Sequence, residues 1–258
     1  MIDKNFLNTI DSPYIYIGRS KSNIDDPKTN PLKIIEFNQS DSIFQQKPVP
    51  EKLNQTLKWP LFTFFKSDKE HYYISGGLDK SPLSVKSHFS VYNPTADPTS
   101  PDSYRILPDM PTPKSSHTMV ERQNYLYVIG GASEETIQKI QIGILETSSK
   151  CERYNLTSET WEVLPDLKTP RIRHGCIVLG DKIYTFGGFE NEIKRTATIE
   201  CLDVNCQNWE YLALKLWAPL DLTSCFVYKD NQVVIVGGNV DGYDMNGVYV
   251  IDFNLETV

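Results

Sequence analysis

The sequence predicts an all-β protein that is built from repeated four-stranded sheets. A Gly-Gly pair closes a short apolar run four times, and the first glycines of successive pairs are 54, 57 and 50 residues apart. A Thr, His or Ser stands 13 residues before each first glycine. Regular spacing of short strands over this distance indicates a repeat architecture. The pairs are Gly76 and Gly77, Gly130 and Gly131, Gly187 and Gly188, and Gly237 and Gly238.

Each repeat begins with a hairpin. An apolar run such as residues 176–179 is followed by a short polar turn, here Gly180 and Asp181, and then by the run that ends in Gly-Gly. Two strands joined by so few residues of this type form an antiparallel hairpin. We expect the residues at the 13-residue spacing to share one position of the repeat. They are Thr63, His117, His174 and Ser224.

A third and a fourth strand complete the repeat. The third strand ends in an aromatic or aliphatic residue followed by Asn or Asp, as at Tyr154 and Leu202, and a tryptophan stands seven residues further on, at Trp161 and Trp209. Four short strands in about 50 residues are typical of a propeller blade. A single blade cannot bury both of its faces, so neighbouring blades must stack around a ring.

The third and fourth units resemble the kelch repeat. The pattern that carries the resemblance is Tyr154-x6-Trp161, then Pro170-Arg171-x2-His174, then the run 183–186 before Gly187-Gly188. The resemblance extends over nearly the whole chain and implies a β-propeller of kelch type. The unit around Gly18 departs most from the pattern, because Arg19 replaces the second glycine.

We expect a single propeller domain over residues 1–258, with about five recognisable blades. Counting seven residues beyond Ile251 reaches Val258, so the last blade is expected to lack its fourth strand. Two alternatives stay open, a five-bladed ring with a weak seam and a part of a longer protein that has a sixth blade. The expected blades are residues 5–62, 63–116, 117–173, 174–223 and 224–258.

Composition excludes several functional classes. Lys and Arg number 26 against 33 Asp and Glu, and a net charge of −7 is unfavourable for gripping phosphate backbones. No apolar run approaches the roughly 20 residues of a membrane helix, and the first residues do not form the apolar core of a signal peptide. Five cysteines do not make a secreted disulfide scaffold. We expect a cytoplasmic protein that binds neither nucleic acid nor membranes.

Motifs for catalysis and metal binding are missing from the sequence. It has no His-Glu-x-x-His pair, no Cys-x2-Cys pairs, no phosphate-binding loop and no Gly-x-Ser-x-Gly elbow. His117 and His174 share a repeat position, which favours a structural hydrogen-bonding role for both. We therefore expect no catalytic residue, no metal and no cofactor. A kelch-like enzyme of the copper oxidase or sugar mutarotase type stays as an alternative, with no residues to assign to it.

The loops between strands are the expected binding surface, because loops on a rigid scaffold carry function. Arg173 is the preferred contact residue, since its planar fork can bind a carboxylate with two parallel hydrogen bonds. Arg171 stands where the kelch pattern often has Arg, which leaves a structural role open for it. The resemblance implies a non-enzymatic scaffold or adaptor that binds proteins, with cytoskeletal association or substrate recruitment to a ubiquitin ligase in a longer protein as specific roles. The candidate contact residues are Lys114, Arg171, Arg173 and Asp221 at one rim, and Glu134 and Glu135 in the long loop 132–150.

Overall fold

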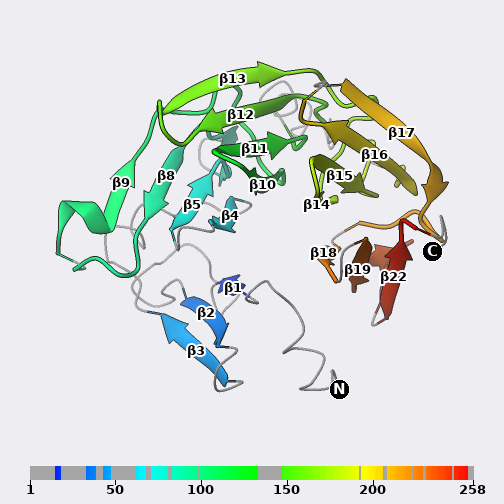
Figure 1. Ribbon diagram of the computed structural model, residues 1–258, viewed down its shortest axis with the longest axis horizontal. Coiled ribbons are helices and arrows are strands. Elements are labelled where there is room, and N and C mark those ends of the chain that lie inside the picture. Colours follow the sequence, from blue (N-terminus) through cyan, green and yellow to red (C-terminus); the bar gives the residue numbers. More distant parts are fainter. Residues whose placement is uncertain are drawn as a thin grey trace.

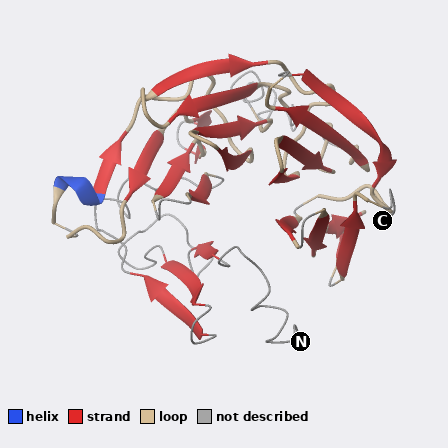
Figure 2. Ribbon diagram, viewed as in Figure 1, coloured by secondary structure: helices blue, strands red, loops and turns tan. Residues whose placement is uncertain are grey.

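Strands make up almost all of the regular structure. The computed structural model describes residues 15–18, 33–38, 43–47, 62–67, 71–80, 83–97, 99–132, 147–191, 193–205, 208–221, 223–228, 231–245 and 247–254. Within these ranges one short 3-10 turn, η1 (Pro101–Ser103), is the helical element, and everything else that is regular is β-structure (Figure 2).

Five antiparallel sheets follow one another around an arc in chain order (Figure 1). Three have four strands, and the strand nearest the centre is in each case the first in sequence. The first complete sheet contains β4 (Thr63–Lys66), β5 (Tyr72–Ser75), β8 (Phe89–Tyr92) and β9 (Tyr104–Ile106). The second contains β10 (Thr118–Arg122), β11 (Tyr125–Ile129), β12 (Cys151–Asn155) and β13 (Thr160–Leu164). The third contains β14 (Gly175–Leu179), β15 (Lys182–Phe186), β16 (Thr198–Asp203) and β17 (Asn208–Lys215).

The sheets at the two ends of the chain show three strands each within the described residues. The first has β1 (Ile15–Gly18), β2 (Lys33–Asn38) and β3 (Ile43–Lys47), and the last has β18 (Ser224–Val227), β19 (Gln232–Val236) and β22 (Val248–Asp252). Two small hairpins extend from the blades, one of β6 (Leu78–Lys80) with β7 (Leu83–Val85), the other of β20 (Asn239–Val240) with β21 (Tyr243–Asp244).

The predicted all-β propeller is confirmed by this arrangement of sheets. We number the sheets as blades 1 to 5 in chain order. The expected first strand near residue 5 and the last residues, 255–258, lie outside the described residues. The blade boundaries and the two alternatives for closing the ring stay predictions.

One predicted equivalence is wrong. The residue that pairs with the last residue before each glycine pair is Thr63 in blade 2, Thr118 in blade 3, Gly175 in blade 4 and Ser224 in blade 5. His117 and His174 therefore stand one residue earlier than the position of Thr63 and Ser224. The spacing misled the comparison because the first hairpins of blades 2 and 5 are one residue longer than those of blades 3 and 4.

Apolar and aromatic side chains fill the spaces between neighbouring blades. The Phe89 ring on blade 2 lies 4.8 Å from the Tyr154 ring and 4.9 Å from the Trp161 ring of blade 3, both edge-on. The Trp161 indole also donates a hydrogen bond of 2.8 Å to the carbonyl of Pro108. Trp209 repeats this bond one blade later, at 3.2 Å to the carbonyl of Pro165. The spacing from Tyr154 to Trp161 thus serves packing between blades, where aromatic rings bury large areas.

The glycine pairs let the chain cross from one blade to the next. Gly130 has φ +63, and a Cβ atom there would lie 2.6 Å from the carbonyl oxygen of Arg171, in the connection to blade 4. The N–H of Gly131 donates a 2.7 Å hydrogen bond to the same oxygen. The pattern recurs with Gly77 donating to Lys114 at 2.9 Å and Gly188 donating to Leu220 at 2.8 Å.

Replacement of Gly130 by Ala should destabilise the protein more than the same change at Gly180. Gly180 has a similar φ of +61, but a Cβ atom at that position would meet nothing within 4 Å, so G180A measures backbone strain alone, about 1 kcal/mol. G130A adds about 1 to 3 kcal/mol for displacing the packed Arg171 carbonyl. Urea denaturation of both variants tests this, and equal losses would contradict the close-approach explanation.

Candidate functional site

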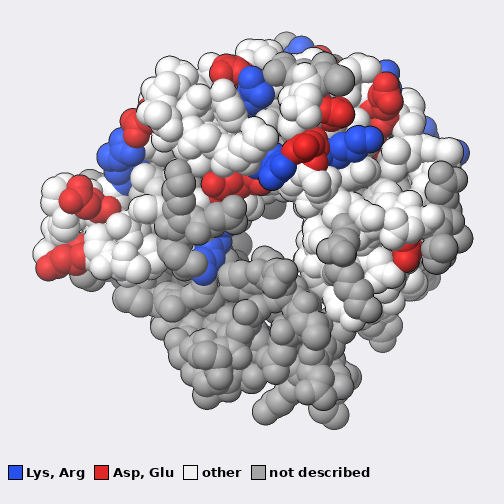
Figure 3. Space-filling view, in the orientation of Figure 1, with Lys and Arg blue, Asp and Glu red and all other residues white. Residues whose placement is uncertain are grey.

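The connections that cross between blades form one rim of the ring. Figure 3 shows an opening at the centre of the arc, with acidic and basic side chains interspersed over the visible face. The predicted rim residues lie in these connections, between the outer strand of one blade and the inner strand of the next. Their burial divides them into two groups.

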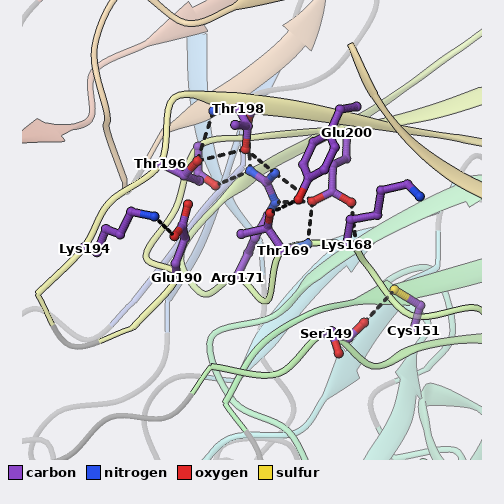
Figure 4. A network of polar contacts seen from close by, with 12 residues as sticks. Ser149, Cys151, Lys168, Thr169, Arg171, Glu190, Lys194, Thr196, Thr198 and Glu200 are labelled. Carbon is purple, nitrogen blue, oxygen red and sulfur yellow. Dashed lines mark hydrogen bonds and ion pairs between the residues drawn. The ribbon is translucent and has the colours of Figure 1, made fainter.

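Arg171 is completely buried in a polar network between blades 3 and 4 (Figure 4). Its Nη2 atom lies 2.9 Å from Oε1 of Glu200, whose side chain is also fully buried. The guanidinium donates further bonds of 2.7 to 2.9 Å to the carbonyl of Gly187 and to the carbonyl and hydroxyl of Thr198. Glu200 in turn accepts the backbone N–H groups of residues 168 and 169. The pair is therefore well hydrogen-bonded, as a buried charge must be.

Lys114 occupies the same place one blade earlier. Its Nζ atom lies 3.2 Å from Oε2 of Glu152 and donates a 2.6 Å bond to the carbonyl of Lys150, all in blade 3. Its own carbonyl accepts the N–H of Gly77 in blade 2. Lys114 and Arg171 thus each join two blades, because the backbone is bonded to one blade and the side chain to the next.

Asp221 is buried at the crossing to blade 5, where the connection supplies the anion of the ion pair instead of the cation. Arg195 donates to it at 2.7 Å and to the side chain of Asn239 at 2.9 Å. The guanidinium carbon of Arg195 lies 4.3 Å from the centre of the Phe189 ring. Leu220 takes the place of Arg171 in this connection.

These positions correct the expectation that Lys114, Arg171 and Asp221 contact a partner at the rim. Their exposed fractions are 0%, 0% and 1%, so they have no surface to offer to another protein. Their partners Glu152 and Glu200 were not expected from the sequence. Both stand two residues before the third-strand marker, at Tyr154 and Leu202, so a repeat-by-repeat search for buried charge could have found them.

Arg173 differs from these three because its side chain is exposed. Its backbone is in the left-handed region, with φ +55, and its N–H donates a 3.1 Å bond to the carbonyl of Ser116, which has φ +53. Within the described part of the chain, the Arg173 guanidinium has no hydrogen bond or ion pair. The left-handed backbone conformation of an arginine costs roughly 1 kcal/mol of folding free energy. Because the Arg173 side chain makes no bond with the described residues that would offset this cost, the surrounding blades must hold the backbone in place.

The predicted contacts Glu134 and Glu135 lie outside the described residues. The expectation that these two glutamates contact a partner therefore stays a prediction.

Sequence comparison agrees with the geometry of blades 2 to 5. A family model described as the KLHDC2/KLHL20/DRC7 Kelch-repeats domain matches residues 63–257. The chain belongs to the kelch-repeat family. The resemblance seen in the sequence is thereby confirmed, and the glycine pairs, Tyr154, Trp161 and Trp209 are its structural markers.

Several curated kelch proteins are similar to this chain. Kelch repeat and BTB domain-containing protein 2 of cowpox virus (strain Brighton Red) is 31% identical over 118 residues, which are 42% of this chain and 21% of the viral protein. Kelch-like protein terF of Aspergillus terreus is 29% identical over 147 residues, covering 55% and 30%. Kelch-like protein 41a of Danio rerio is 28% identical over 178 residues, covering 68% and 28%. The matched region spans less than a third of each of these relatives.

The two kelch histidines bond to the preceding blade. His117 Nε2 lies 2.7 Å from the Ser75 hydroxyl, and His174 Nε2 lies 2.8 Å from the Thr118 hydroxyl. Both rings are buried. Burial, with smaller effects of Arg171 and Lys114, lowers the pKa of His174 to about 3, and burial lowers the pKa of His117 well below its usual value. The rings are neutral structural hydrogen-bonding groups at neutral pH.

Other reactive groups of the described residues are protected by burial. No group of three or more His, Cys, Asp or Glu side chains in the described ranges is placed to hold a metal ion. Burial raises the pKa of the Cys151 and Cys225 thiols to about 12, which keeps them protonated and unreactive.

Among the described residues, no helix has the length and apolar character to cross a membrane.

Removal of the Arg171 side chain should strongly destabilise the propeller. R171A leaves the Glu200 carboxylate buried without its cation, which costs about 3 to 5 kcal/mol. The control is R105A, because the Arg105–Glu159 pair is exposed by 53% and 41% and such pairs contribute about 0 to 1 kcal/mol. Urea denaturation at neutral pH compares the two variants. A loss for R171A that is no larger than that for R105A would contradict the assignment.

Acid should destabilise the folded state through His174. Its pKa is lower in the folded chain than in the unfolded chain, so the unfolded state binds more protons below pH 6.5 and stability is lost between about 6.5 and 3. The slope approaches about 1.4 kcal/mol per pH unit for one such histidine. H174Q should be less stable at pH 7.5 but show a shallower decline. Urea midpoints from pH 7.5 to 4.5 measure both slopes, and identical slopes would refute this contribution.

Proposed function

We propose that this kelch chain is a non-enzymatic protein-interaction module that uses Arg173 as a contact residue. Membership of the kelch-repeat family supports the general role. The specific site is supported by one observation above the others, an exposed arginine that is held in a strained backbone conformation and has no partner among the described residues. Strain that persists at an exposed position is a reason to look for function there.

The chemistry of the site favours an acidic segment of a partner protein. The guanidinium presents two parallel donors that match a carboxylate, and its backbone is fixed by the bond to Ser116, which limits the entropy lost on binding. The net charge of −7 works against a nucleic-acid partner. A role as an adaptor of a ubiquitin ligase, and a cytoplasmic location, stay predictions that belong to this proposal.

The test compares proteins captured from native cell extract by the wild-type chain, R173G and R105A. Gly adopts positive φ without strain, so R173G should fold as well as the wild type or be stabilised by up to about 1 kcal/mol. A specific set of proteins should be retained by the wild type and R105A and be lost with R173G.

Capture of the same set by R173G would overturn the role of Arg173. Recovery of no specific protein by any form would count against the interaction module itself. Urea denaturation of R173G confirms that any loss of capture does not come from unfolding.

A further inference from the structure

The hairpin that follows β15 presents an isoleucine at its tip. Phe189 forms one bridge with Arg195 and another with Ile172, so the base of the hairpin is attached to the connection that carries Arg173. Ile193 lies at the other end and is 89% exposed, the largest fraction among the exposed large apolar side chains of the described residues. Covering such a side chain is favourable, because it removes apolar surface from water.

Hydrogen bonds hold this tip in one conformation. The N–H of Glu190 donates a 2.8 Å bond to the carbonyl of Lys194 across the hairpin. The Asn191 side chain accepts the N–H groups of Ile193 and Lys194 at 3.2 and 3.0 Å. At the base, Arg195 is bonded to the buried carboxylate at the crossing to blade 5. A side chain on a segment that is already ordered loses little entropy when a partner covers it.

The described charged side chains of the hairpin are already paired. Nζ of Lys194 lies 2.5 Å from Oε2 of Glu190, and Arg195 forms an ion pair with Asp221. Arg173 differs from them, since within the described residues its guanidinium has neither a hydrogen bond nor an ion pair. The described residues of the hairpin and of the adjoining connection thus offer one unpaired cation and one exposed apolar side chain.

The bridge between Ile172 and Phe189 sets the separation of these two groups. Because the bridge is antiparallel, Arg173 lies one residue to the side away from the tip, about 3 Å along the chain. The tip lies about two residues, or about 7 Å, beyond Phe189. The backbones of Arg173 and Ile193 are therefore about 10 to 12 Å apart, which three or four residues of an extended chain would span.

We propose that Ile193 is a second contact residue of the Arg173 site, and that the partner segment is an extended peptide with one acidic and one apolar residue about three or four positions apart. The acidic residue binds the Arg173 guanidinium, and the apolar residue packs against Ile193. This inference rests on the function proposed for Arg173 and adds the chemistry of the segment that the site selects. A segment that has only one of the two residues makes only half of the contact.

A phage-displayed library of random peptides is the probe, and it is selected on the full wild-type chain. The enriched peptides should share Asp or Glu with an aliphatic or aromatic residue about three or four positions away. A peptide from this set is then synthesised with a fluorescent label, and its binding to the chain and to its variants is measured by fluorescence anisotropy.

Replacement of Ile193 by Ser should weaken binding of this peptide by about tenfold or more, since an anchoring apolar contact is lost. I193S should fold as the wild type does, because the side chain is exposed, and urea denaturation checks this. V163S is the matched control, since Val163 is 71% exposed on β13, and it should bind as the wild type does. The peptide with Ala in place of its apolar residue should bind the wild type and I193S equally, because the contact is then missing from both.

The outcomes separate this inference from the function on which it rests. Peptides that lose affinity with R173G but bind I193S as they bind the wild type would overturn the role of Ile193 and leave the Arg173 contact standing. Peptides that bind R173G as they bind the wild type would overturn both. A selection that enriches no common pattern of acidic and apolar residues would overturn the proposed segment.

Discussion

The structure depends on one repeated hydrogen bond, which in three of the four glycine pairs runs from the second glycine to the carbonyl of the connection that crosses to the next blade. Gly131 donates to Arg171 at 2.7 Å, and the same bond recurs at the two neighbouring crossings. It forms because no Cβ separates the two backbones and because glycine adopts the positive φ without strain. The connection is then fixed between blades, so its side chain reaches the next sheet in a set direction.

The residue at this point of the connection differs between crossings. The space between neighbouring blades is accordingly filled in two ways, by an ion pair or by apolar side chains. Blades 3 and 4 bury a cation against a glutamate, whereas blade 5 has Leu220 in the cation's place and Tyr249 in the glutamate's. Buried ion pairs and well-packed apolar groups of similar size are often nearly equal in stability, although half a pair is costly. The ring tolerates both solutions because each of them leaves no charge unpaired.

Much of the fold was predictable because it is determined by local sequence. Paired glycines and the Tyr154-to-Trp161 spacing identify strands and their order without any knowledge of distant contacts. The equivalence of Thr63 with His117 failed because an added residue in a hairpin changes the count while leaving the strand register unchanged. The prediction that Lys114, Arg171 and Asp221 contact a partner was wrong for another reason. A charged residue in a connection looks the same in the sequence whether its side chain points to solvent or into the space between blades.

The sequence by itself determined the repeat, the four-stranded blade and the family, because periodic apolar residues and glycines act within a single blade. Only the tertiary structure decided that Lys114, Arg171 and Asp221 are buried and that Arg173 is exposed and left-handed. Burial and exposure depend on which surfaces of different blades meet, and that meeting is a property of the assembled ring.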